Sequence, residues 1–169
     1  MKRMKTIIVA LALIIGTTGA AIAQTKVAHI EAQVLVESMP EYKAAISSLE
    51  KIERSYDTEI KAMMKELETK MRQYDSEAAS KTEQENMKRV EEVQEMQGNI
   101  QAYRQQALAD IEKKQMDIMK PILEKARAAI QKVGKAQGFQ YVFDSSIGSG
   151  ILMAEGKDLM NDVKKELGI

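Results

Sequence analysis

Length, composition and charge limit what this chain can be. It has 169 residues, with 25 Lys and Arg against 25 Asp and Glu, and it has no Cys. The balanced charge gives no electrostatic reason to expect nucleic acid as a partner, and a chain without Cys has no disulfides to stabilise it. Trp is absent and Phe occurs twice, so little bulky material is available for a large core. This composition, 30% charged, is typical of long helices with narrow apolar seams.

The first 23 residues have the features of a secretory signal peptide. Three basic residues among the first five precede an apolar run over 7–15, and small residues lead to Ala23. The run is too short for an uncleaved membrane anchor, which needs about 20 apolar residues. Cleavage after Ala23 is therefore predicted, and it leaves 24–169 as the mature chain. That chain has 22 Lys and Arg against 25 Asp and Glu, so its net charge is −3.

A short strand and a long helix are expected next. Residues 26–31 are typical of a strand and 32–38 of one or two helical turns, and Pro40 suits the first turn of a new helix. Residues 41–78 contain no Gly or Pro. Such a helix would be about 57 Å long, so it must project from any small domain. Its apolar residues are spaced four and three apart, which predicts a heptad seam of Ile60, Met64, Leu67, Met71, Tyr74 and Ala78.

A helical hairpin is predicted, with its tip at 79–82. Ser80-x-x-Glu83 and Thr82-x-x-Glu85 both fit a capping box at the start of a return helix. This helix is expected to run from about Thr82 towards Gln137, with a kink at Pro121. Its seam is predicted to contain Val93, Met96, Ile100, Tyr103, Ala107, Ile111, Ile118, Ile122 and Ala126.

The chain changes character after the return helix. Gly134 and Gly138 are expected to stop that helix. Residues 139–143 and 150–154 are predicted to be the two strands of a hairpin. A short helix over 158–167 would then close the chain, with Leu159, Met160, Val163 and Leu167 on one face.

These elements predict an α+β fold, with a small β-rich body and a long antiparallel helical hairpin as a coiled-coil-like arm. The mature chain would be one domain, with 24–40 and 121–169 in the body and 41–120 in the arm. Three short strands rarely form a stable sheet alone, so assembly of several copies would bury their apolar residues. The bulky residues near the C-terminus are therefore candidates for an oligomer interface: Phe139, Tyr141, Phe143, Ile151 and Met153.

No catalytic, cofactor or metal site is predicted, and we expect no enzyme. His29 is the only His and lies on a predicted strand, where a packed or partly exposed residue is the simpler interpretation. Gly148-Ser149-Gly150 lacks the following Lys and helix of a phosphate-binding loop. The many Glu residues lie beside Lys and Arg, which is typical of a solvated helix surface.

The methionines of the arm are the residues best suited to bind many partners. Met is flexible and polarisable, so it packs against varied sequences. Met64, Met71 and Met96 fall on the predicted seams. Met63 and Met87 lie off them, and these two are the candidates for contact with a bound polypeptide.

The order of these elements resembles the Skp/OmpH family. The resemblance covers the mature chain and rests on Lys26-Val27-Ala28-His29-Ile30-Glu31, Pro40-Glu41-Tyr42-Lys43-Ala44-Ala45, Lys120-Pro121-Ile122-Leu123 and Gly138-Phe139-Gln140-Tyr141-Val142-Phe143-Asp144. It implies a periplasmic homotrimer in which a β-rich body joins three chains. Three hairpins would then surround a cavity that takes up unfolded outer-membrane β-barrel proteins without ATP. Glu31 departs from the pattern, because Asp is commoner there.

Two functions stay open at this point. The resemblance implies a holdase chaperone that prevents the aggregation of unfolded outer-membrane proteins. A structural coiled-coil spacer or adaptor of the cell envelope fits the helical seams equally well. The best-known members of the family are strongly basic and have a proposed lipopolysaccharide site. This chain is mildly acidic, so weak or absent binding to lipopolysaccharide and anionic membranes is expected.

Overall fold

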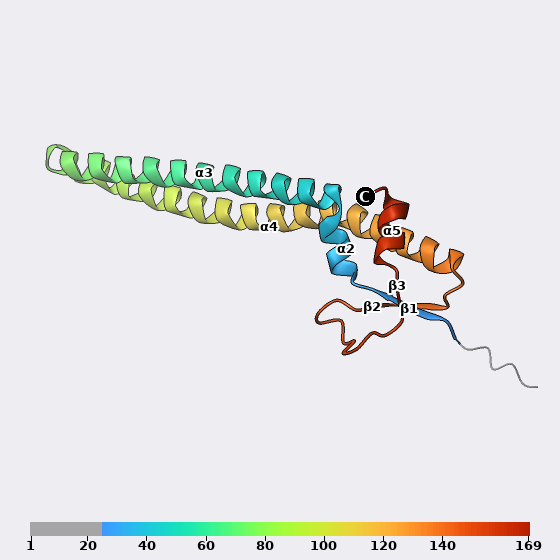
Figure 1. The fold of residues 1–169 in the computed structure, drawn as a ribbon. Helices are drawn as coiled ribbons and strands as arrows, with labels where there is room; N and C mark the ends of the chain where they lie inside the picture. The colour runs from blue at the N-terminus through green and yellow to red at the C-terminus, as the bar shows by residue number, and fades with distance from the viewer. Residues whose placement is uncertain (1–24) are drawn as a thin grey trace, which may run out of the picture.

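A long helical rod projects from a small body in the computed structural model (Figure 1). The structure describes residues 25–169, so the predicted signal peptide lies outside the described residues. The rod consists of two helices that lie side by side, and the body contains both ends of the described chain. The elements in order are β1 (Val27–Ile30), α2 (Ala32–Ser38), α3 (Pro40–Glu77), η1 (Ala78–Ser80), α4 (Glu83–Ala136), β2 (Tyr141–Asp144), β3 (Lys157–Asp158) and α5 (Met160–Leu167).

The sheet has the strand order β2-β1-β3, and both of its strand pairs are parallel. His29 of β1 lies opposite Phe143 of β2 and opposite Asp158 of β3. The predicted hairpin is therefore wrong: residues 150–154 are not a strand, and β3 follows further along the chain. Parallel strands cannot be joined by a tight turn, so residues 145–156 form a loop that returns the chain to the other side of β1.

The core of the body is formed by both ends of the described chain together with the last part of α4. Ile30, Leu35, Met39, Leu159 and Val163 are its largest fully buried side chains. Ala126, Ala129 and Val133 of α4 belong to the same cluster. The predicted apolar face of the last helix is confirmed, since all four of its residues are buried in this core or pack against it. This core orients the hairpin, because α4 continues from the body into the arm.

The two helices of the arm pack along a continuous seam of buried and half-buried side chains. On α4 the predicted seam is confirmed, and Ile100, Ala107, Ile122 and Ala126 are buried in it. On α3 the predicted seam is confirmed at Ile60, Leu67 and Tyr74 and is wrong at Met64, Met71 and Ala78, which are exposed. Met64 and Met71 are both 46% exposed, and the half-buried positions beyond Ile60 are Met63, Leu67, Lys70, Tyr74 and Glu77.

The body explains why the seam of α3 has this phase. Ala45 and Leu49 are buried next to the body, and the half-buried Ile52 and Tyr56 follow them. Continuing that heptad brings Met63 rather than Met64 against α4. The same phase places Lys70 and Glu77 in the seam, where apolar residues would be expected from the pattern alone. The distal half of the arm therefore has a partly polar seam.

The two glycines expected to stop the return helix have different roles. Gly138 has a φ of 74°, and the N–H of Phe139 donates to the carbonyl of Gly134 at 2.9 Å, an arrangement typical of a helix C-terminus. Gly134 itself lies inside α4, so its predicted role is wrong. A Cβ there would stand 2.9 Å from Cγ2 of Val142, so Gly134 allows β2 to approach the helix. The helix also continues through Pro121 without interruption.

Replacing Gly134 and Gly98 by Ala is expected to change stability in opposite directions. Gly98 has open space around it, so Gly98→Ala raises the free energy of unfolding by about 0.5–1 kcal/mol through helix propensity. Gly134→Ala forces the stiff Val142 side chain away, and such overpacking costs about 1–3 kcal/mol. We therefore expect Gly134→Ala to lower the free energy of unfolding in chemical denaturation. Equal stabilisation by both variants would contradict the close approach of β2.

Candidate interaction surfaces

Polar side chains of the body bond to one another and to the backbone around the end of β2. Nδ1 of His29 lies 3.1 Å from Oγ of Ser145. The Asp144 carboxylate accepts hydrogen bonds from the N–H of Ala32 at 3.1 Å and from the N–H of Ser146 at 2.9 Å. Burial alone would raise the pKa of Asp144, but these bonds and the Ser146 hydroxyl outweigh it and lower the pKa. These contacts tie the end of β2 to the start of α2.

Residues 25–169 lack two features, a cluster of metal-binding side chains and a membrane-spanning helix. Residues 25–169 contain no group of three or more His, Cys, Asp or Glu side chains placed to hold a metal ion. Over the same residues, no helix combines the length and the apolar character that a membrane span requires.

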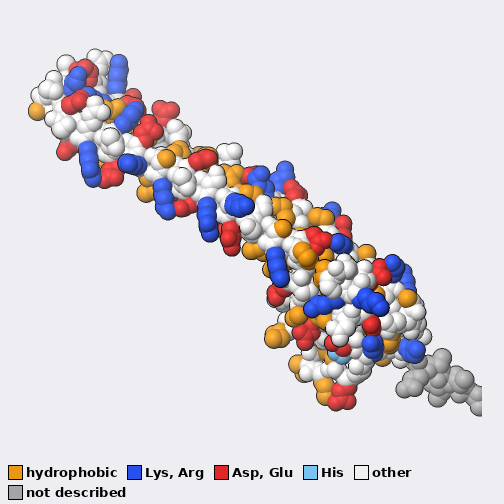
Figure 2. All heavy atoms as spheres, turned by 45° about the horizontal axis from the view of Figure 1, so that its top comes forward, with side chains coloured by type: hydrophobic (Ala, Val, Ile, Leu, Met, Phe, Trp, Pro, Cys, Tyr) orange, Lys and Arg blue, Asp and Glu red, His pale blue; other side chains and the backbone are white. Residues whose placement is uncertain are grey.

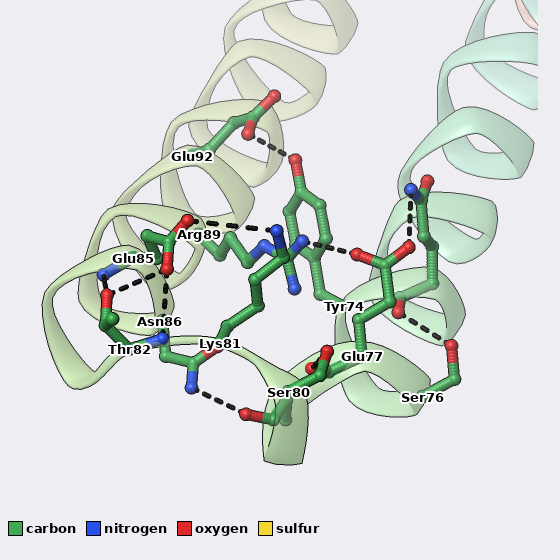
Figure 3. Close-up of polar contacts among 12 residues, drawn as sticks. Tyr74, Ser76, Glu77, Ser80, Lys81, Thr82, Glu85, Asn86, Arg89 and Glu92 are labelled. Atoms are coloured by element: carbon green, nitrogen blue, oxygen red, sulfur yellow. Dashed lines mark hydrogen bonds and ion pairs between the residues drawn. The ribbon is translucent and has the colours of Figure 1, made fainter.

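The tip of the arm is closed by a capping box (Figure 3). The N–H of Glu85 donates to Oγ1 of Thr82 at 3.2 Å, and the Glu85 carboxylate accepts from the N–H of Thr82 at 3.0 Å. Of the two boxes that the sequence allowed, this one is formed; the Ser80 hydroxyl donates to the carbonyl of Glu77 instead. Nδ2 of Asn86 also reaches across the turn to the carbonyl of Ala78 at 3.0 Å.

A network of charged side chains joins the two helices just behind the tip (Figure 3). Arg89 pairs with Glu77, and its guanidinium lies 4.5 Å from the ring centre of Tyr74. The Glu92 carboxylate accepts from Lys70 and from the Tyr74 hydroxyl, and these bonds lower the pKa of Glu92. Cross-helix bonds here replace the apolar seam.

A second polar cluster lies nearer the body. The Tyr103 hydroxyl donates to Glu59, and this bond raises the pKa of Tyr103 to about 12. The Tyr56 hydroxyl donates to Asp110, and the rings of Tyr56 and Tyr103 lie 6.0 Å apart. These bonds link α3 to α4 by side chains that water can reach. Hydrogen-bonded seams of this kind hold register but give less stability than buried apolar ones.

The tip is expected to be the first site of proteolysis. Lys81 is exposed between η1 and α4, where a capping box and a few polar bonds hold the turn. Thr82→Ala removes the cap, which is worth about 1 kcal/mol, and should accelerate tryptic cleavage after Lys81. Thr58→Ala is the matched control, because the Thr58 hydroxyl bonds only its own helix, to the carbonyl of Arg54. First cuts within β1, β2 or β3 would contradict the layout.

Apolar side chains are exposed on the distal arm. We call Met64, Met71, Met87 and Val90 the distal stripe. Each is between 46% and 61% exposed. Met71 and Val90 line one open groove of about 740 Å³, and Met64 and Met87 line grooves that adjoin it through shared residues. Figure 2 shows charged side chains of both signs alternating along the arm, with apolar ones between them.

The two methionines predicted to contact a bound polypeptide are placed differently. Met87 is 61% exposed and belongs to the distal stripe. Met63 is half-buried in the seam, so little of it is available to a partner. Met64 and Met71 are the additional exposed residues, and sequence reasoning missed them because it assigned them to the seam. The sequence signal that could have identified them is the heptad that starts at Ala45 and Leu49, because it places Met64 and Met71 outside the seam. Ala45 and Leu49 themselves are buried next to the body.

Four of the five residues predicted for an oligomer interface are exposed on the single chain. Tyr141 and Phe143 stack with their ring centres 6.2 Å apart, and both stay largely exposed. Ile151 and Met153 line a small pocket together with Phe143. Phe139 differs, since it packs partly against the core of its own chain. Ile147 and Leu152 are fully exposed and were not singled out from the sequence.

The sequence and the fold are both similar to those of known proteins. The family model for "Outer membrane protein (OmpH-like)" matches residues 26–167. No curated protein matches the chain. A crystal structure of a protein from Caulobacter crescentus CB15, described as a proposed outer membrane chaperone (OmpH-like), superposes with a TM-score of 0.74. The two chains are 16% identical, and the match covers 85% of each. The arrangement of body and projecting hairpin therefore occurs in a solved structure.

Proposed function

Because the chain belongs to the OmpH-like family of outer membrane proteins, we propose that it is an ATP-independent holdase chaperone of the periplasm. In this proposal the chain is exported by its signal peptide, loses residues 1–23 and assembles as a homotrimer through its body. Three arms then enclose unfolded outer-membrane β-barrel proteins and delay their aggregation. The chain needs no cofactor for this activity and has no enzymatic role.

The observation that carries the proposal is the distal stripe on a projecting arm. An isolated hairpin gains nothing from exposed Met64, Met71, Met87 and Val90 unless they contact something else. Met adapts its shape to varied partners, and unfolded barrel proteins expose apolar surface for long periods before they insert. Several weak contacts from three arms would add up without requiring one defined binding sequence.

The test compares two unrelated unfolded β-barrel proteins diluted from denaturant with and without the mature protein. A holdase suppresses light scattering by both proteins when the molar ratio of assembly to client is near one. The alternative function, a structural spacer or adaptor of the cell envelope, predicts protection of neither. Mass measurement of the mature protein alone and with a client reports assembly and capture in the same experiment. Failure to protect either client would contradict the proposal.

Client capture is expected to change little between low and moderate salt. Between Met64 and Met96 the arm has six basic and nine acidic residues, and the ion pairs there join neighbouring side chains. A net acidic arm repels polyanions, so weak or absent binding to lipopolysaccharide and anionic vesicles is also expected. Titrating a client at both salt levels, and vesicles with and without anionic lipid, checks both statements. A steep loss of client affinity with salt would show that charge carries the binding.

A further inference from the structure

The methionines of the chain differ in how far a small oxidant can reach their sulfur atoms. Met39 is 1% exposed in the body core, and Met63 is half-buried in the seam of the arm. The three methionines of the distal stripe are between 46% and 61% exposed. The chain has no Cys, so these thioethers are the sulfur groups that water-soluble oxidants meet on the distal arm.

One of the three sulfurs is held by a cation from the opposite helix. Nη2 of Arg104 on α4 donates to Sδ of Met64 on α3 at 3.0 Å. Arg104 is the only charged residue between 96 and 109, so its own helix offers no carboxylate one turn away. Among the ion pairs within residues 25–169, none uses Arg104. The guanidinium therefore donates to a thioether, which is a weak acceptor.

This contact makes the two sides of the Met64 sulfur unequal. A thioether sulfur has two lone pairs, and oxidation at one or the other gives opposite sulfoxide epimers, because the two carbons bonded to the sulfur differ. The N–H of Arg104 occupies one side, so an oxidant meets the other. Across residues 25–169 this is the one hydrogen bond to a sulfur atom, so Met71 and Met87 have no such bias.

We propose that Met64 is a site of reversible oxidation on the distal stripe and that Arg104 directs the oxygen to one face of its sulfur. The oxidant is a peroxide. An S–O bond forms and the O–O bond breaks, so the sulfur is oxidised by two electrons and the peroxide is reduced to water. A thiol-dependent reductase reverses the step: two thiols become a disulfide, and the sulfoxide oxygen leaves as water.

Oxidation changes what the distal stripe can bind. A sulfoxide is polar and chiral where the thioether was apolar and flexible, and this change disrupts surfaces that depend on Met. The inference rests on the proposed holdase function and adds regulation to it. Client capture by the arm falls when the stripe is oxidised and returns when a reductase repairs it.

Peptide mapping of the intact mature protein after brief peroxide treatment tests the site without reference to activity. The stripe methionines should be oxidised at least about tenfold faster than buried Met39. After digestion, the peptides are treated with two reductases, each specific for one sulfoxide epimer. One reductase should repair about tenfold more of the Met64 sulfoxide than the other, which is the bias that one hydrogen bond from a charged group gives. Met71 and Met87 sulfoxides should divide evenly between the two.

Two arginine variants show whether Arg104 causes the bias. Arg104→Leu removes the donor, so its Met64 sulfoxide should divide evenly between the two reductases. Arg54→Leu is the matched control, because Arg54 is also exposed on the arm but pairs with Glu50. It should keep the bias of the native protein. An even division at Met64 in the native protein, or an unchanged bias in Arg104→Leu, would overturn the role of Arg104.

Client protection before oxidation, after it and after repair tests the consequence. Half-maximal suppression of light scattering should need about tenfold more oxidised protein, as loss of three sulfur contacts of ordinary strength would produce. Repair should reverse the change. Met116→Leu with Met153→Leu removes two exposed methionines outside the stripe, and this variant should still lose protection on oxidation. In a variant with Leu at 64, 71 and 87, any protection should be the same before and after peroxide.

These measurements separate the inference from the proposed function. If the unoxidised protein protects no client, the proposed function fails, whatever the peptide maps show. If it protects clients equally well before and after oxidation of the stripe, the function stands and the regulation is wrong. The same conclusion follows if the Met116 and Met153 variant no longer responds to peroxide. Mass measurement of the oxidised protein checks that a loss of protection does not come from a loss of assembly.

Discussion

Phe143→Asp is expected to convert the proposed trimer into folded monomers. Phe143 is 46% exposed on the single chain and stacks on Tyr141, so the substitution costs the isolated fold little. In an assembly that covers β2, the new carboxylate would be buried without a partner, which costs several kcal/mol. Every copy in a closed ring would bury one such carboxylate, so the free-energy cost of assembly rises with the number of copies.

Mass measurement in solution and circular dichroism separate dissociation from unfolding. Phe143→Asp should lower the mass to that of one chain while the helical signal of α3 and α4 remains. Met116→Asp is the matched control, because Met116 is 66% exposed and lies on the arm. If Phe143→Asp stays trimeric, the interface does not include β2. If Met116→Asp dissociates, the arms and not the body hold the assembly together.

Shortening the arm by two heptads in each helix is expected to abolish most client protection without changing assembly. The deletion removes 60–73 from α3 and 93–106 from α4, which shortens the hairpin by about 21 Å. It keeps the seam in phase and leaves the tip intact, including the Arg89–Glu77 pair and the Tyr74–Glu92 bond. A shorter arm encloses less volume and lacks Met64 and Met71 of the distal stripe.

A full-length variant separates the two contributions that the arm can make to client protection, which are apolar contact and confinement. Met64→Gln, Met71→Gln, Met87→Gln and Val90→Thr keep its length but remove the apolar stripe. If apolar contact holds the client, this variant should lose protection nearly as fully as the shortened arm. Full protection by the substituted arm would show that confinement alone suffices. Loss of the trimer in the shortened variant would contradict assembly through the body.

The hairpin could be predicted from the sequence because its signals are local. Each capping residue, heptad spacing and helix-ending glycine acts within a few residues of itself, so Thr82, Glu85, Ile100 and Gly138 have the predicted roles. The absence of Gly and Pro over 41–78 likewise predicted a single long helix, and α3 is one.

The tertiary structure decided what local pattern leaves open. Where two apolar residues are adjacent, either of them can occupy the seam position of a heptad. In α3, Met63 lies in the seam and Met64 in solvent. This phase is set by Ala45 and Leu49, which are buried next to the body by non-local contacts. The strand pairing is also non-local: β1 lies between β2 and β3, which are more than 100 residues away in sequence. The apolar run at 150–154 has the composition of a strand, yet both neighbours of β1 are already in place. The run lies in a loop instead, because β3 pairs parallel with β1 on the side away from β2 and the chain needs residues 145–156 to return to the start of that strand.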